Sequence, residues 1–315
     1  VMGFFGTMIG LGPMMGPFVG GVILSCIGWR WIFWLNIPIC CYAIWGMRHF
    51  NCEQQLQNIP FNAQSISLFG VVFMSLLLFL SFFPTHVWHS TMMIILLAIV
   101  VVGLVLLVVS ERNTNHPIID LSVLKSVRFI VPLVAVSCFG GALMATMFTL
   151  PIYFENLQYL QPWQTGFILI SMPVGLVLFA RLSTKFSSCF GEKRIMWIGL
   201  LIMLAVLVVL TQLTATWSVT LIVILLFVLG IGGGLFQTPN MMYIMQQAGA
   251  HQQASVSAFL RMVQNFGIAF AATACAMLMT LQSKANLMAG VVHGWWLALL
   301  LMSIAVLGFI VLGKR

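Results

Sequence analysis

The residues of this 315-residue chain that could do acid–base, nucleophilic or metal chemistry are few and scattered. The sequence holds five carboxylates, six histidines and seven cysteines. It has no Cys-x-x-Cys pair, no His-Glu-x-x-His run and no Gly-rich phosphate loop ending in Lys-Ser or Lys-Thr. The sequence therefore predicts no metal site, no cofactor and no enzymatic activity.

A second set of polar residues lies within or beside long apolar runs. Polar groups at membrane depth face protein or a water-filled cavity, so they are candidates for a substrate or proton path. The set is Glu155, Gln237, Asn240, Arg261, Gln264 and Asn265. Glu155 either has a titratable functional role or is a solvated residue of an outer loop. Arg261, Gln264 and Asn265 are spaced i, i+3, i+4 on one helix face, where membrane-surface anchoring is the alternative role.

The composition explains why polar residues inside apolar runs matter. Apolar residues make up 62% of the chain and charged residues only 6%, against roughly 25% charged in soluble domains. So few charges cannot cover the surface of a soluble globule, which excludes a soluble enzyme. The net charge of +8 does not indicate nucleic-acid binding, because the charges cluster between long apolar runs.

Those runs predict an all-α polytopic membrane protein, because a helix needs about 20 apolar residues to cross the hydrocarbon core. We expect ten spans, and splitting the two longest charge-free runs at polar breaks gives their limits. They are 2–24, 32–48, 66–84, 91–109, 129–151, 163–181, 195–213, 217–237, 257–281 and 293–312. Eleven of the thirteen Lys and Arg residues then lie on one side, with Arg30 and Lys284 on the other. The basic side is therefore predicted to be cytoplasmic.

The first expected span carries a periodic stripe of small residues. Gly12, Gly16 and Gly20 recur every four residues, Pro13 and Pro17 lie beside them, and Gly21 follows. Such a stripe lets a neighbouring helix approach closely, and each proline favours a bend. Gly267, Ala271 and Cys275 form a weaker stripe, which is a candidate partner for the first. The run 230–234, with four glycines, predicts a bend or another close approach.

These motifs resemble those of a known family. The Gly-Pro repeat with its closing Gly20-Gly21 is similar to the antiporter motif of the major facilitator superfamily. The segment 29–38 that follows resembles a signature of its fourteen-helix drug:proton antiporters, of the EmrB/QacA type. The matching residues are Trp29, Arg30, Trp31, Phe33, Asn36 and Pro38. More loosely, the expected loop around 180–194 is similar to a second copy of the family's cytoplasmic loop motif, with Thr184 replacing an acidic residue. A basic anchoring loop is the alternative for that segment.

The resemblance implies a major facilitator fold with about ten transmembrane helices of an original fourteen, the first four being absent. Residues 1–48 would then be the last two helices of an N-terminal bundle, 49–128 two linker helices and a cytoplasmic loop, and 129–315 a C-terminal six-helix bundle. The parent protein would reside in the cytoplasmic (inner) membrane.

The implied function is proton-coupled multidrug efflux of amphipathic or aromatic compounds. A truncated, transport-inactive remnant of such an exporter is the alternative. The implied partners are a small amphipathic substrate, protons and membrane lipids, with a periplasmic adaptor and outer-membrane channel in Gram-negative relatives. No nucleic acid is expected.

Overall fold

The computed structural model describes residues 19–47, 63–82, 91–113, 126–214, 217–247, 253–280 and 287–313. Four residues of the first glycine-proline stripe, Gly12, Pro13, Gly16 and Pro17, lie outside them. The described part is helical and contains no strand, which confirms the all-α prediction.

The helices follow the expected spans. Residues 19–26 are helical, and the remaining elements are α2 (Arg30–Met47), α3 (Ala63–Phe82), α4 (Thr91–Asn113), α6 (Val127–Ile152), the π-helical turn η1 (Tyr153–Leu157), α7 (Pro162–Leu169), α8 (Ser171–Phe190), α9 (Glu192–Leu210), α10 (Val219–Gln247), α11 (Gln253–Thr280) and α12 (Leu287–Gly313). Within the described ranges, seven helical segments are long and apolar enough to cross a membrane. The chain is therefore a multi-pass membrane protein. The proposed division into three domains stays a prediction.

The expected loop at 182–194 is instead almost entirely helical. Helix α8 continues to Phe190 and α9 begins at Glu192, so Gly191 alone joins them. Gly191 has a φ of +86°, which glycine adopts without the steric cost of a side chain. The hydroxyls of Ser183, Thr184 and Ser188 each donate a hydrogen bond to the carbonyl three residues earlier. Polar residues that suggested a loop are thus accommodated within the helix.

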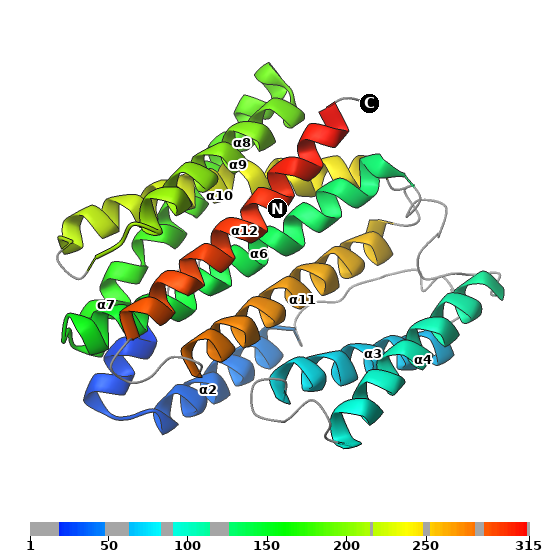
Figure 1. The fold of residues 1–315 in the computed structure, drawn as a ribbon, viewed down its shortest axis with the longest axis horizontal. Coiled ribbons are helices and arrows are strands. Elements are labelled where there is room, and N and C mark those ends of the chain that lie inside the picture. Colours follow the sequence, from blue (N-terminus) through cyan, green and yellow to red (C-terminus); the bar gives the residue numbers. More distant parts are fainter. Residues whose placement is uncertain are drawn as a thin grey trace.

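The helices from α6 onward pack as two neighbouring groups (Figure 1). Helix α10 packs mainly against α8 and α9, while α11 and α12 pack mainly against α6. Aromatic rings join the groups: Phe236 of α10 lies 5.4 Å from Phe139 of α6 and 6.2 Å from Phe309 of α12, centroid to centroid. All three rings are fully buried, so the core lies where the two groups meet.

The glycine run of α10 makes the close approach that the sequence predicts. A Cβ at Gly234 would lie 2.5 Å from the Leu176 carbonyl oxygen of α8, and one at Gly232 would lie 2.8 Å from the Gly199 carbonyl oxygen of α9. These distances are too short for any side chain. Glycines on different faces of α10 therefore bring two neighbouring backbones into contact with it.

The weaker stripe on α11 faces α6. A Cβ at Gly267 would collide with the Ser137 carbonyl group, and one at Gly141 would lie 3.5 Å from the Ala271 Cβ. The sequence offered this stripe as one candidate partner of the first span, and because Gly12 and Gly16 of that span lie outside the described residues, the pairing stays a prediction. The face is already filled from within the same half of the chain.

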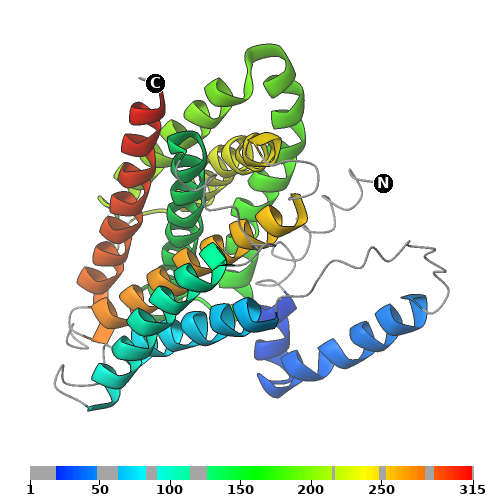
Figure 2. The same ribbon diagram turned by 90° about the vertical axis from the view of Figure 1, so that its right-hand side faces the viewer.

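The described helices before α6 are more loosely attached. Helices α3 and α4 form a pair that touches α11, while α2 projects away from the rest (Figure 2). Most α2 side chains are exposed, including the apolar Phe33 and Tyr42. In a bilayer, such surfaces contact lipid or further protein.

Candidate functional site

A polar network anchors the π-helical turn that carries Glu155. The Tyr153 hydroxyl donates to the Thr214 carbonyl oxygen at 3.0 Å. The Gln158 amide nitrogen donates to the Tyr153 hydroxyl at 2.9 Å and to the Trp217 carbonyl oxygen at 3.3 Å. The network ties the end of α6 to the connection between α9 and α10. It leaves the side chain of Glu155 partly exposed, and π-helical turns often mark functional positions.

Asn240 is buried inside α10 and bonds to α6. Its side chain has 0% exposure, and its amide nitrogen donates to the Pro132 carbonyl oxygen at 3.2 Å. Its amide oxygen has no hydrogen-bond partner in the described part of the chain. Gln237, one turn earlier, is partly buried. We expected the span to end at 237, but α10 continues to Gln247, so both residues lie within the helix.

The three polar residues of α11 differ in burial. The Arg261 guanidinium donates to the Gln264 side-chain oxygen at 3.3 Å. Gln264 is 8% exposed, whereas Arg261 and Asn265 are exposed. Gln264 packs against α6, because a Cβ at Gly140 would lie 3.1 Å from the Gln264 Cγ. The hydrogen bond agrees with the expected shared face for Arg261 and Gln264.

The candidate path residues do not form one cluster in this conformation. Asn240 reaches α6 at Pro132 and Gln264 reaches it at Gly140. These contacts are eight residues apart, or about 12 Å along a helix. Glu155 lies beyond the far end of α6. The arrangement is a set of polar points along one helix.

The signature residues of α2 contact mainly one another. The Arg30 guanidinium lies 5.2 Å from the centroid of the Trp29 ring, which meets Phe33 edge to face at 6.2 Å. Asn36 donates to the Ile32 carbonyl oxygen at 3.4 Å, and Pro38 lies inside the helix. Trp31, also in this segment, is 54% exposed.

The end of the glycine-proline stripe touches α7. A Cβ at Gly21 would lie 2.8 Å from the Pro162 carbonyl oxygen and 3.3 Å from the Trp163 Cα. At Gly20, no described atom lies within 4 Å of such a Cβ. Of the two closing glycines, Gly21 is therefore the one that requires a bare backbone.

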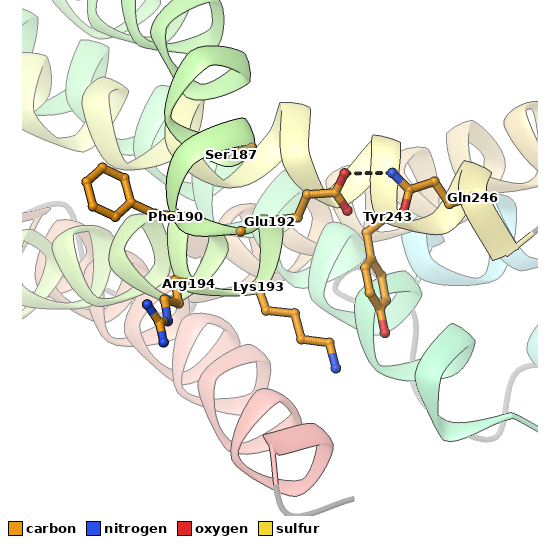
Figure 3. Close-up of a pocket in the computed structure, with 8 residues that line it drawn as sticks. Ser187, Phe190, Glu192, Lys193, Arg194, Tyr243 and Gln246 are labelled. Atoms are coloured by element: carbon orange, nitrogen blue, oxygen red, sulfur yellow. Dashed lines mark hydrogen bonds between the residues drawn. The ribbon is translucent and has the colours of Figure 1, made fainter.

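Sequence reasoning missed a pocket at the junction of α8 and α9, which we call the junction pocket (Figure 3). Its volume is about 610 Å³, and its polar lining includes Ser187, Glu192, Lys193, Arg194 and Gln246. The Gln246 amide nitrogen donates to the Glu192 carboxylate at 2.7 Å. The charged run Glu192-Lys193-Arg194 was the only sequence signal for it. No group of three potential metal ligands occurs in the described ranges.

The sequence of this chain is similar to a known family and to several known proteins. The family model described as Major Facilitator Superfamily matches residues 63–272, from α3 into α11. The riboflavin transporter RibZ of Clostridioides difficile is 29% identical over 85% of this chain and 58% of its own length. The multidrug transporter protein MdtP of Bacillus subtilis is 26% identical over 84% of this chain and 50% of its own.

A third relative, the multidrug efflux pump SdrM of Staphylococcus aureus, is 24% identical over 90% of this chain and 62% of its own. The chain thus spans between half and two thirds of the length of these curated relatives. The matched family model covers most of the helices described above, including those that carry Asn240 and Gln264. This chain therefore belongs to the major facilitator superfamily, a family of membrane transporters.

Proposed function

We propose that this chain is part of a proton-coupled multidrug exporter of the cytoplasmic membrane, of the fourteen-helix EmrB/QacA type. The observation that carries the proposal is the likeness, over more than four fifths of the chain, to proteins named multidrug transporter and multidrug efflux pump. The resemblance of the glycine-proline stripe to the antiporter motif supports export, and at the end of that stripe Gly21 meets the backbone of α7.

The polar points along α6 fit a substrate or proton path. Asn240 and Gln264 are buried at membrane depth, and Asn240 keeps one amide oxygen without a partner among the described residues. A buried acceptor of this kind can take a hydrogen bond from a substrate, a water molecule or a protonated group. We also assign Gln237, Arg261, Asn265 and Glu155 to this path, since Gln237 lies one turn from Asn240 and Arg261 is hydrogen-bonded to Gln264. Aromatic and methionine side chains supply soft, adaptable walls for apolar substrates.

A second candidate substrate is riboflavin or a similar planar aromatic solute. The riboflavin transporter relative matches 271 residues of this chain at 29% identity. Such a solute is itself amphipathic, so it suits the same kind of path. Comparing riboflavin with cationic dyes as competitors separates a vitamin transporter from a multidrug exporter.

The test is an efflux assay on the 315-residue chain in bacteria that lack their own drug exporters. We expect cells expressing the chain to lose a preloaded fluorescent dye faster than control cells. Collapse of the proton gradient should abolish the difference. If the chain inserts at normal abundance but moves neither dye nor riboflavin, the inactive-remnant alternative is favoured. Dye efflux that persists without a proton gradient would contradict proton coupling. Co-expression with a periplasmic adaptor and outer-membrane channel then tests that partnership.

A further inference from the structure

The junction pocket lies at the surface of the membrane. Segments 162–190 and 192–210 each qualify as a membrane span, and Gly191 alone separates them. The chain must therefore turn back into the bilayer at this residue. Lys193 and Arg194 follow the turn directly, and both are exposed. Basic residues at such a turn lie at the depth of lipid headgroups.

The charges of the pocket leave its cations available. Among the described residues of the lining, Glu192 is the only carboxylate, and the Gln246 amide of α10 donates a hydrogen bond to it at 2.7 Å. Figure 3 shows Lys193 and Arg194 extending away from this Glu192–Gln246 pair. The Lys193 ammonium lies 5.7 Å from the centroid of the Tyr243 ring, which does not neutralise its charge. The pocket therefore presents two positive charges against one occupied negative charge.

Two further features favour a phosphate ligand. Helix α9 begins at Glu192, so its first backbone N–H groups point toward this turn without helical acceptors. The Ser187 side chain lines the pocket and is 7% exposed, yet its hydroxyl has no hydrogen-bond partner within the described part of the chain. The neighbouring Ser188 hydroxyl, by contrast, is bonded within α8.

The apolar part of the pocket selects the kind of phosphate. Phe190 lines it beside the cations and is 59% exposed. A soluble phosphate has no apolar group that could contact this ring, whereas a phospholipid places acyl chains next to its headgroup. We propose that the junction pocket binds the headgroup phosphate of an anionic phospholipid. Lys193 and Arg194 contact the phosphate, and Phe190 contacts the upper acyl chain. Basic pockets between membrane helices bind anionic headgroups in this way.

The test measures lipid binding by the purified chain in detergent, so it is independent of transport. The probes are phosphatidylglycerol and phosphatidylcholine with identical acyl chains, and native mass spectrometry gives their affinities. In the double variant Lys193→Gln/Arg194→Gln, we expect the affinity for phosphatidylglycerol to fall at least roughly tenfold. Phosphatidylcholine, which carries no net charge, should bind equally to both proteins.

The matched control is Arg128→Gln/Lys185→Gln, which removes two exposed charges on the predicted cytoplasmic side but outside the pocket lining. It should change phosphatidylglycerol affinity by less than about twofold. An equal loss in both double variants would reduce the effect to general surface charge and overturn the proposal. The proposal would also fail if inorganic phosphate bound as tightly as phosphatidylglycerol, because Phe190 would then contribute nothing to lipid recognition. If the double variant does not fold, each single variant should lower affinity about fivefold, and an unchanged affinity in both refutes the site.

Discussion

Replacing Gly21 with alanine should disturb the contact between the first span and α7. The added methyl carbon would lie 2.8 Å from the Pro162 carbonyl oxygen, well inside the 3.4 Å at which ordinary van der Waals contact begins. The Pro162 carbonyl oxygen and the nearby Trp163 Cα both belong to the backbone, so neither atom can rotate away. The two helices must therefore separate, and overpacking of this kind costs about 1–3 kcal/mol. An energy of that size shifts an equilibrium between two conformations by roughly 5- to 150-fold.

Gly20 provides the matched control. It precedes Gly21 in the same helix, and no described atom lies within 4 Å of a Cβ built on it. Both alanine substitutions gain the same helix propensity, about 1 kcal/mol. We expect Gly21→Ala to slow gradient-driven dye efflux at least about fivefold at unchanged membrane abundance, while Gly20→Ala transports normally. Thermal unfolding in detergent gives a second readout, in which the Gly21→Ala variant should unfold at a lower temperature than the Gly20→Ala variant.

The reasoning fails if the two variants behave alike in both measurements. Equal unfolding temperatures would mean that the α7 contact does not constrain this helix. Equal unfolding temperatures with different efflux would place the effect of Gly21 elsewhere, for example on the substrate path. A slower Gly20→Ala variant would point to a contact with residues outside the described ranges.

Three further predictions concern single residues. Asn240→Ala removes the hydrogen bond to Pro132, so the free energy of unfolding should fall by about 0.5–1.5 kcal/mol, measured by denaturation in detergent; unchanged stability would contradict a structural role for that bond. Glu155→Gln should leave efflux unchanged across the pH range, because the Glu155 side chain is partly exposed and glutamine keeps its size and polarity; a loss of efflux would instead assign Glu155 to proton coupling. Cys189 is exposed, and Tyr159→Cys would introduce a thiol at a second exposed position. Impermeant thiol reagents should label the two thiols from opposite sides of the membrane, with Cys189 on the cytoplasmic side. Labelling of both thiols from the same side would overturn the predicted topology.

The spans could be predicted because their signal is local and strong. A charge-free run of about 20 apolar residues leaves a helix as the only stable way to cross the bilayer. The close approach of α10 was also predictable, because a run containing four glycines leaves a backbone bare. Which helix packs against a given stripe of small residues was not predictable in the same way. Gly267 was one candidate contact for the first span, and no sequence pattern indicated that it lies against Ser137 of α6.

The polar network at η1 shows why the rest of the site could not be predicted. Tyr153 and Thr214 are 61 residues apart in sequence, and Gln158 and Trp217 are 59 apart. No periodicity within one segment reports which distant connection it meets. The Gly191 turn was missed for another reason. Its charged and hydroxyl residues suggested a loop, but the hydroxyls are satisfied inside α8, as the Ser188 bond shows.

The packing from α6 onward suggests two units that are each joined through backbone contacts. A Cβ at Gly230 of α10 would collide with the Met172 carbonyl of α8, and one at Gly175 of α8 would collide with the Phe227 carbonyl of α10. In the other unit, Gly267 of α11 meets the Ser137 carbonyl of α6. Between the units the contacts involve side chains such as Phe236 and Phe309, which can repack as helices move. Each glycine-joined unit should therefore move as one body.

A double-mutant cycle tests this division. Gly175→Ala and Gly230→Ala both force α8 away from α10, so once the first is present the second should cost less, and their combined loss of unfolding free energy should be smaller than the sum. Gly230→Ala and Gly267→Ala act on different helix pairs, so their losses should add to within about 0.3–0.5 kcal/mol. Thermal or denaturant unfolding in detergent gives the free energies of unfolding of the wild type, the three single variants and the two double variants. Strong coupling between Gly230 and Gly267 would mean that the two units respond as one block. Full additivity between Gly175 and Gly230 would mean that α8 and α10 do not form one unit, and either result would refute the division.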